Sequence, residues 1–509
     1  MISKSNNRKI GILLQYSQMG LSIIISFVYT PVMLKILGSS EYGLYNLANS
    51  IISYLSLLSL GFGASYIRFY SKYKANKDEE GIAKLNGLYL IVFIIIGIIA
   101  LICGVLLSGN IANILNDTYT KADKQIAGTL MIIMAINLAW SFPSSVFTAY
   151  ITSQEKFIFQ KSINMIRTVI GPFVTLPVLL LGYGSIGMVV ISTIVTFFAD
   201  VINIIYCKRI GMNILFKNID FLLLKDIFVF SIFIAINQII DQINWATDKV
   251  ILGKVCNGAV VAYYSIGAQI NTYFTQFSTA VSSVFVPEIH RIESSELTTD
   301  EINKKQTDLF IKVGRLQFIL LALILTGFIL FGKFFVSVWA GVEYSSSYYV
   351  AILLMTPAIV PLTQNIGIEV QRAKNKHQFR SVVYLVMAII NIIISIYFAA
   401  LWGEIGAAIG TAISLVLANG LVMNIFYHKV IGINILLFWK KIMILMPGII
   451  IPCLIMKCMV NFWPTNSITR LLVGIAFYVI LYALCIFVIG LDANEKKYII
   501  SKLRKVIGR

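Results

Sequence analysis

Charged residues make up only 13% of this 509-residue chain, about half the share found in soluble domains. Histidine occurs three times, and no GxxxxGK[ST] motif is present, so the chain has no P-loop for ATP hydrolysis. The six cysteines form no CxxC pair, which argues against a disulfide framework and against a zinc site. We therefore expect neither a metal nor a cofactor.

Apolar residues, in contrast, make up 58% of the chain, and its mean hydropathy is +0.85. Apolar runs of about 20 residues, the length of a membrane-spanning helix, recur from end to end. The fold class we predict is an all-α polytopic membrane protein. We expect about fourteen spans, at 10–34, 42–65, 86–108, 126–149, 159–181, 185–207, 226–247, 258–284, 312–334, 347–369, 381–401, 404–427, 441–460 and 468–490.

Basic residues gather on one side of these spans. With fourteen spans both termini share a side, and its loops and termini hold 33 of the 41 Lys and Arg residues. Cytoplasmic loops carry such an excess, so we expect both termini to be cytoplasmic and the first span, from about Ile10, to be retained. This orientation accounts for the net charge of +18, and no nucleic-acid partner is expected.

Two segments about six spans apart are similar. Ile36–Tyr45 reads ILGSSEYGLY, and Ile251–Tyr264 reads ILGKVCNGAVVAYY. Both give Ile-Leu-Gly, four residues, Gly and then Tyr near the start of a span. Parallel repeats related by an axis along the membrane normal occur in transporters. Shared turn chemistry, with glycine ending or starting a helix, is the simpler alternative.

Enzyme motifs are weak. GYGSIG (Gly182–Gly187) matches GxGxxG, but it lies between two spans without the βαβ unit of a nucleotide site, so we interpret it as a turn. The histidines (His290, His377 and His428) lie in loops, away from any carboxylate at membrane depth. The outer loops are too short for most lipid-dependent glycosyltransferases. We expect no enzyme activity.

Polar residues at helical spacing mark several spans. In span 7, Asn237, Asp241, Asn244 and Asp248 share one face, at steps of four, three and four residues. Stripes in three other spans consist of Gln15, Gln18, Ser22, Ser26 and Tyr29; Tyr42, Asn46, Asn49, Ser53 and Ser56; and Ser265, Gln269, Thr272, Gln276 and Thr279. Helix–helix hydrogen bonds explain single members. Taken together, the stripes favour the lining of a water-filled cavity.

Arg167 is the most informative single residue. It lies about 10 Å into span 5, where an arginine is costly and a functional role is the default. The alternative is a structural ion pair with Asp241 or Asp200. Asp241 itself could contact sugar hydroxyls, bind a coupling ion or pair with Arg167, and the sequence leaves these alternatives open.

The chain resembles the polysaccharide repeat-unit flippases (Wzx-type O-antigen transporters), in the superfamily that also holds MATE multidrug exporters and lipid II flippases. The resemblance spans the whole chain. It rests on LKILGSSEYGLYNLANSIISYLSLLSLGFGASYIRFYSK (Leu34–Lys72), ATDKVILGKVCNGAVVAYYSIGAQI (Ala246–Ile270), SSVFVPEI (Ser282–Ile289) and SQEKFIF (Ser153–Phe159). It implies two MATE-like six-helix lobes, 1–215 and 216–435, followed by a helix pair and a basic tail at 436–509.

The resemblance also implies a function in the bacterial plasma (inner) membrane. Undecaprenyl-pyrophosphate-linked oligosaccharides would be flipped to the outer leaflet by alternating access, for surface polysaccharide biosynthesis. The expected partners are this lipid-linked substrate, membrane lipids, and the polymerase and glycosyltransferases of the pathway. The substrate-binding candidates are Arg167, Arg68, Arg372, Asn237, Asp241, Asn244, Asn49 and Gln269, and the candidates for ion coupling are Asp241 and Glu369.

Two of these assignments have plainer alternatives. Arg68 matches the family's usual arginine at the inner end of span 2, where it could also be a snorkelling anchor. Asp248 matches a frequent acidic residue and could simply end a helix or join the lobes. Alternative functions are a cation-coupled multidrug exporter and a lipid II-type flippase. A membrane-embedded glycan polymerase or ligase fits less well because the outer loops are short.

Overall fold

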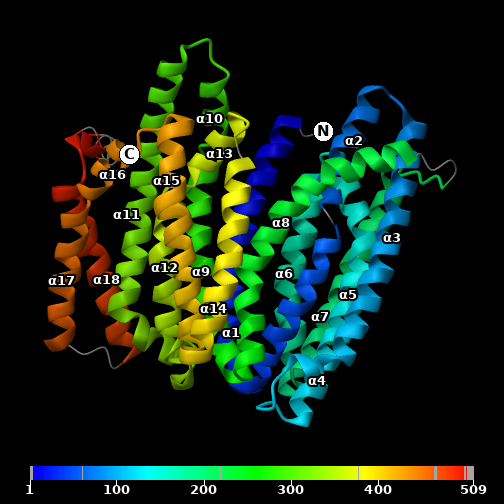
Figure 1. The fold of residues 1–509 in the computed structure, drawn as a ribbon, viewed down its shortest axis with the longest axis horizontal. Coiled ribbons are helices and arrows are strands. Elements are labelled where there is room, and N and C mark those ends of the chain that lie inside the picture. Colours follow the sequence, from blue (N-terminus) through cyan, green and yellow to red (C-terminus); the bar gives the residue numbers. More distant parts are fainter. Residues whose placement is uncertain are drawn as a thin grey trace. The chain divides into compact units, whose positions relative to one another are not determined.

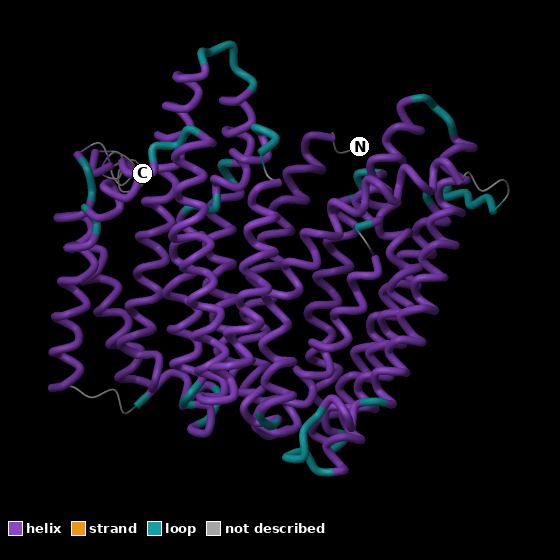
Figure 2. The backbone as a smooth tube through the Cα atoms, in the orientation of Figure 1, coloured by secondary structure: helices purple, strands orange, loops and turns teal. Residues whose placement is uncertain are grey.

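Helices form every regular element of the part of the chain that the computed structural model describes (Figures 1 and 2). The structure describes residues 4–59, 61–216, 221–376, 378–462, 467–493, 495–497 and 500. The side chains of some helical residues, including Asn237 and Asp241, lie outside this description, as does the whole of His377. The predicted all-α membrane fold class is confirmed.

The helices are long and apolar enough to cross a bilayer. Among the described residues nine pass this test by length and composition, or ten if one bent pair of helices counts as a single span. Some of these nine contain a break and cover two of the expected spans. The number fourteen stays a prediction.

Two breaks explain why long helices cover several expected spans. Helix α1 (Lys4–Leu55) is interrupted at Gly38, whose φ of 71° and ψ of 174° are not helical. Helix α14 (Gln378–Leu415) is interrupted at Trp402 and Gly403, and the glycine has a φ of 57°. A positive φ is cheap only for glycine, so both chain reversals occur where the sequence supplies one.

The chain divides into two compact units. Unit 1 comprises Met1–Ser265 and Ala399–Glu404, and unit 2 comprises Ile266–Phe398 and Ile405–Arg509. Unit 1 contains α1 and the helices that follow it, α2 (Phe62–Ala75), α3 (Glu79–Gly109), α4 (Ile111–Ile114), α5 (Lys121–Ser153), α6 (Phe157–Leu180), α7 (Gly184–Arg209) and α8 (Phe221–Val255). In this unit α3 packs on α5, α5 on α7, and α6 on both α1 and α7 (Figure 1).

Aromatic side chains form much of the core of unit 1. Phe62 and Tyr66 of α2 are buried against Tyr89 and Phe93 of α3, with ring centroids between 5.1 and 6.4 Å apart. Edge-to-face pairs of this kind add to the stabilisation from buried apolar area.

Helix α2 continues to Ala75, about ten residues beyond the expected end of span 2 at 65.

Unit 2 contains the later helices. Helix α9 (Gly258–Ser283) enters it from unit 1. It also holds α10 (Val286–Glu293), α11 (Thr299–Trp339), α12 (Ser347–Thr363), α13 (Ile366–Ala373), most of α14, α15 (Met423–Phe426), α16 (Ile435–Met443), α17 (Met446–Phe462) and α18 (Ile468–Cys485). Helices α17 and α18 pack on each other, and both also pack on α11 (Figure 1).

Helix α11 is much longer than a membrane span. Its 41 residues extend about 60 Å at 1.5 Å per residue, against about 30 Å for the hydrocarbon core. The apolar run begins at Leu316, so the turns from Thr299 to Arg315 lie at the membrane surface or beyond it. The expected span 312–334 covers only the apolar part of this helix.

A buried arginine fixes the chain's last described segment to α11. The Arg315 side chain is 3% exposed. Its Nε and Nη2 atoms donate to the two carboxylate oxygens of Glu495 at 3.0 and 2.8 Å. Its Nη1 and Nη2 atoms also donate to the carbonyl oxygens of Lys441 and Gly490, at 2.6 and 3.1 Å. Four hydrogen bonds thus satisfy one guanidinium at the surface end of α11.

Candidate functional site

Three helices of unit 1 bring polar groups together within the membrane-spanning region. Arg167 of α6 donates from Nη2 to the Thr196 hydroxyl of α7 at 2.8 Å. One turn further along α7, the Asp200 carboxylate accepts a hydrogen bond from Ser144 of α5 at 2.9 Å. Asp200 is buried, with 8% of its surface exposed. The cluster is held by α5, α6 and α7, which pack against one another.

Arg167 itself is exposed on α6, beside the exposed apolar residues Ile166 and Ile170. A guanidinium has five N–H donors in a planar fork. Thr196 accepts from one nitrogen, and the surface of the side chain remains accessible. Among the described contacts, Arg167 is hydrogen-bonded to Thr196 and forms no ion pair with Asp200, so its role stays a prediction.

The polar face of α8 is described only in part. The side chains of Asn237 and Asp241 lie outside the described residues, although their backbone is helical. Asn244 is half-buried, and Asp248 is 2% exposed and accepts a hydrogen bond from Tyr264 of α9. The acid before ILG is therefore buried and hydrogen-bonded to the next helix.

Helix α8 is also joined to α1 by polar contacts that the sequence analysis did not identify. Gln242 donates to the Ser53 hydroxyl, and the hydroxyls of Tyr54 and Thr247 form a second hydrogen bond. Both contacts lie within unit 1. Ser53 belongs to a predicted stripe, but its partner Gln242 lies one residue away from the predicted face of span 7.

The remaining stripes contain both satisfied and exposed members. Tyr29 bonds the Thr175 hydroxyl of α6 at 2.8 Å, and Asn46 donates to the carbonyl of Tyr42 in its own helix. Gln269 of α9 is half-buried and donates to the Tyr273 hydroxyl at 2.7 Å. Asn49 is exposed. Hydrogen bonds within the helix bundle thus account for several polar residues of the stripes. They do not account for the exposed Asn49.

The other basic candidates have partners in the structure. The Arg68 guanidinium lies 4.3 Å from the centroid of the Phe230 ring and is exposed. Arg372 of α13 donates to Glu369 at 2.6 Å, and its side chain is 61% exposed. The structure therefore pairs a substrate-binding candidate with an ion-coupling candidate. Neither Arg68 nor Arg372 lies in the α5–α6–α7 cluster.

The two similar ILG segments contact each other. A Cβ atom on Gly43 would lie 1.7 Å from the carbonyl oxygen of Gly258. A Cβ on Gly258 would lie 2.8 Å from the carbonyl oxygen of Ser40. Both distances are shorter than any real contact of a Cβ, so only glycine permits this backbone approach. The shared Gly is thus required by packing between the two segments.

Sequence reasoning missed the polar face of α7. Thr196, Asp200, Asn203 and Cys207 are buried, at steps of four, three and four residues. This is the same spacing as the predicted face of span 7, so the signal was present in the sequence. Within the described residues no group of three or more His, Cys, Asp or Glu side chains could hold a metal ion.

Comparison with known sequences gives three matches. A family model described as polysaccharide biosynthesis protein matches residues 32–349. The membrane protein EpsK of Bacillus subtilis (strain 168) is 22% identical over 96% of this chain and 96% of its own. A Shigella flexneri protein named as an O-antigen transporter is 21% identical over 78% of this chain and 92% of its own.

Solved structures share the fold. The lipid II flippase MurJ, in an inward closed conformation, matches 93% of this chain and 98% of its own, with a TM-score of 0.72 and 16% identity. An inward-facing MATE multidrug transporter of the MOP superfamily matches 83% of this chain and 98% of its own, with a TM-score of 0.59 and 12% identity. The predicted MATE-like architecture is confirmed by these likenesses.

Proposed function

Because the chain belongs to the polysaccharide biosynthesis protein family, we propose that it is a flippase for lipid-linked oligosaccharides. The relative named as an O-antigen transporter and the fold shared with a lipid II flippase support this proposal. The substrate would be an oligosaccharide repeat unit on undecaprenyl pyrophosphate. It would move from the inner to the outer leaflet of the bacterial plasma membrane by alternating access.

One structural observation carries the proposal: membrane-spanning helices expose polar side chains. Arg167 of α6, Asn49 of α1, Gln238 of α8 and Thr272 of α9 are all exposed. Exposure to hydrocarbon would cost an arginine several kcal/mol, so such residues face water or a protein interior in membrane proteins. We infer that Arg167, Asn49 and Gln238 of unit 1 face water, as a path for sugars requires.

We assign Arg167 to the substrate's pyrophosphate. A planar guanidinium can bind phosphate oxygens through two parallel hydrogen bonds, and Thr196 of α7 holds one nitrogen of Arg167. Arg68 and Arg372 are further phosphate candidates, each exposed. Asn49, Asn237, Asp241, Asn244 and Gln269 are assigned to the sugar hydroxyls.

The coupling of transport to an ion is assigned to Asp241 or Glu369. Glu369 is 20% exposed and already paired with Arg372, so its proton or ion would compete with this arginine. The same proposal includes two lobes at 1–215 and 216–435, the 436–509 segment with its helix pair and tail, and cytoplasmic termini. The pathway's polymerase and glycosyltransferases are its proposed protein partners.

The test is complementation of a chromosomal deletion. Deletion is expected to accumulate lipid-linked repeat units on the inner face, and the wild-type gene to remove them. Arg167→Ala at normal expression is expected to leave them accumulated, while Arg167→Lys restores part of the flux. Arg209→Ala, at an exposed arginine at the end of α7, is the matched control and should complement fully. Full complementation by Arg167→Ala would remove the assigned role of Arg167.

The second candidate is a cation-coupled multidrug exporter, favoured by the buried carboxylate of Asp200. Exporters of this kind use a carboxylate in the first lobe. Drug susceptibility of the deletion strain separates the two functions. A flippase predicts unchanged susceptibility to cationic drugs together with lost surface polysaccharide, and an exporter predicts the reverse.

A further inference from the structure

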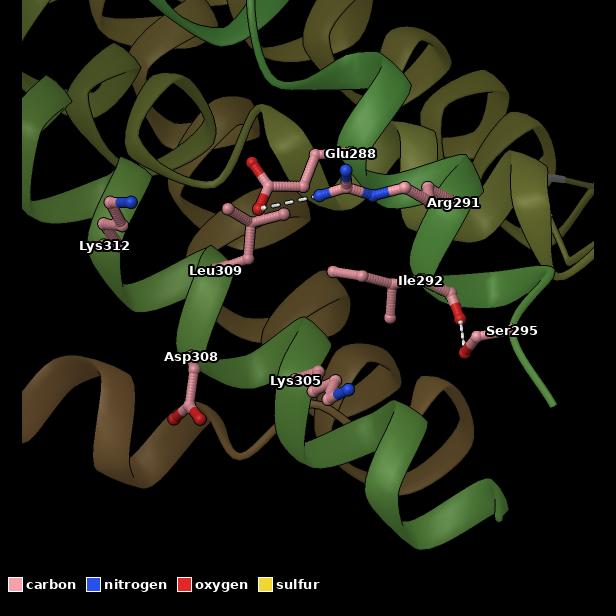
Figure 3. A pocket seen from close by; sticks show the side chains of 8 residues that line it. All are labelled: Glu288, Arg291, Ile292, Ser295, Lys305, Asp308, Leu309 and Lys312. Carbon is pink, nitrogen blue, oxygen red and sulfur yellow. Dashed lines mark hydrogen bonds and ion pairs between the residues drawn. The ribbon is translucent and has the colours of Figure 1, made fainter. Parts of the chain in front are cut away.

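A pocket opens between α10 and the beginning of α11, outside the polar cluster described above. Its volume is about 450 Å³, within the range of small-molecule sites. Eight residues line it, as Figure 3 shows: Glu288, Arg291, Ile292, Ser295, Lys305, Asp308, Leu309 and Lys312. All belong to unit 2.

Local sequence sets the walls of this pocket. Pro287 lies in the first turn of α10, and Thr298 caps the N-terminus of α11 in a capping box completed by Glu301. On each wall the lining residues stand at positions i, i+3, i+4 and i+7, the spacing of one helical face, although Ser295 follows the end of α10. Gln306 donates to Glu293 at 2.6 Å and ties the two helices together below the loop. The pocket is therefore a fixed feature of the α10–α11 turn.

The charges around the pocket are unequal. The lining contains three cationic side chains (Arg291, Lys305 and Lys312) and two carboxylates (Glu288 and Asp308). Glu288 lies 3.8 Å from Arg291, which already offsets part of its charge. In Figure 3 the Asp308 carboxylate turns away from the gap between the helices. The two lysines, two helical turns apart on α11, are left as the main cationic groups.

The floor of the pocket is apolar. Ile292 and Leu309 face each other across the gap between α10 and α11 (Figure 3). Ser295 contributes little polarity, since its hydroxyl donates to the carbonyl of Ile292 at 2.6 Å. A ligand here would place an anionic group against the lysines and an apolar part against the two aliphatic side chains.

We place the Lys312 end of the pocket at the depth of lipid headgroups. Lys312 is four residues before Leu316, where the apolar run of α11 begins. Lys305 is about 10 Å further from the hydrocarbon, at 1.5 Å per residue. Phospholipid phosphates occupy this interfacial layer on either side of the hydrocarbon core.

We propose that the α10–α11 pocket binds the headgroup phosphate of an anionic phospholipid from the adjacent leaflet. Lys312 binds the phosphate, Lys305 and Arg291 attract the anionic headgroup from further out, and Ile292 and Leu309 contact the carbon atoms of the headgroup. A lipid is favoured over a free phosphate because the site combines cations with an apolar floor at the membrane surface. This site is independent of the oligosaccharide-flipping proposal.

The test measures phosphatidylglycerol binding to the purified full chain by native mass spectrometry, with phosphatidylcholine, a zwitterion without net charge, as the comparison. Lys305→Gln/Lys312→Gln is expected to weaken phosphatidylglycerol binding roughly 25-fold, since each lysine near an anionic surface contributes about fivefold. Lys305→Arg/Lys312→Arg should retain most of the affinity. The matched control is Lys304→Gln/Lys72→Gln, two exposed lysines outside the pocket, and should bind as wild type.

Two results would overturn the proposal. One is equal phosphatidylglycerol binding by the Lys305→Gln/Lys312→Gln variant and its control. The other is displacement of the lipid by inorganic phosphate at a matching concentration, which would identify a site for a soluble anion. All variants change exposed lysines, and equal thermal unfolding temperatures would verify that each is folded.

Discussion

The hydrogen bonds of Arg315 allow a quantitative prediction about the end of the chain. Removing one partner of a buried ion pair costs about 3–5 kcal/mol. The Glu495 side chain is 35% exposed, so water recovers part of this cost. Arg315→Ala also leaves the carbonyl oxygens of Lys441 and Gly490 without this donor. We therefore expect a loss of about 2–3 kcal/mol, and about 1 kcal/mol for Glu495→Gln, which keeps the volume but not the charge.

Chemical unfolding of the detergent-solubilised protein, monitored through the C-terminal segment by hydrogen exchange, measures this loss. The control is Glu288→Gln, whose ion pair with Arg291 is exposed and should contribute less than about 0.5 kcal/mol. A loss below about 0.5 kcal/mol for Arg315→Ala would refute the reasoning. So would equal losses for Glu495→Gln and Glu288→Gln.

The same contact predicts a pH dependence. Burial raises the pKa of the Glu495 carboxyl. The hydrogen bonds from Arg315 and from the backbone of Asp492, with the charges of Arg315 and Lys441, outweigh burial and leave this pKa below its usual value. A lowered folded-state pKa contributes stability above the unfolded value of about 4.3, and the contribution is lost as the pH falls through the folded pKa. Glu495→Gln should remove this dependence on acidic pH.

Two further substitutions test the packing of unit 1. Gly43→Ala should destabilise the protein by about 1–3 kcal/mol, because its Cβ would overlap the carbonyl of Gly258. Gly20→Ala, where a Cβ meets nothing within 4 Å, should be neutral or stabilising, and equal unfolding temperatures for the two variants would contradict the close approach. Ser144→Ala removes the hydrogen bond to the buried Asp200 and should cost about 1–3 kcal/mol, measured in the same unfolding assay. No loss at neutral pH would mean that this carboxylate is satisfied in another way.

Much of the fold could be predicted, because the length of an apolar run and the position of a glycine determine the conformation of the backbone around them. The apolar runs predict membrane helices, and the breaks at Gly38 and Gly403 lie between expected spans. The full lengths of α2 and α11 could not be predicted for a physical reason. Both helices continue beyond the bilayer as polar helices, which a hydropathy pattern alone does not register.

The candidate site could be predicted less fully. A single polar face predicts that a helix meets polar groups, but it does not identify the partner helix. Arg167 was found because an arginine at membrane depth is costly, whereas its partner Thr196 is an ordinary residue that only tertiary packing selects. The choice between Asp241 and Asp200 as its ion-pair partner stays open, because the Asp241 side chain lies outside the described residues.

The measurement that tests the central claim most directly is flipping by the purified protein in proteoliposomes. A fluorescent undecaprenyl-pyrophosphate oligosaccharide would be followed from one leaflet to the other. We predict flipping by the wild type, at least tenfold slower flipping by Arg167→Ala, and intermediate flipping by Arg167→Lys, since a charged hydrogen bond contributes about 1.5–3 kcal/mol. An unchanged rate in Arg167→Ala would contradict the role of this arginine. No flipping by the folded wild-type protein would contradict the proposed function itself.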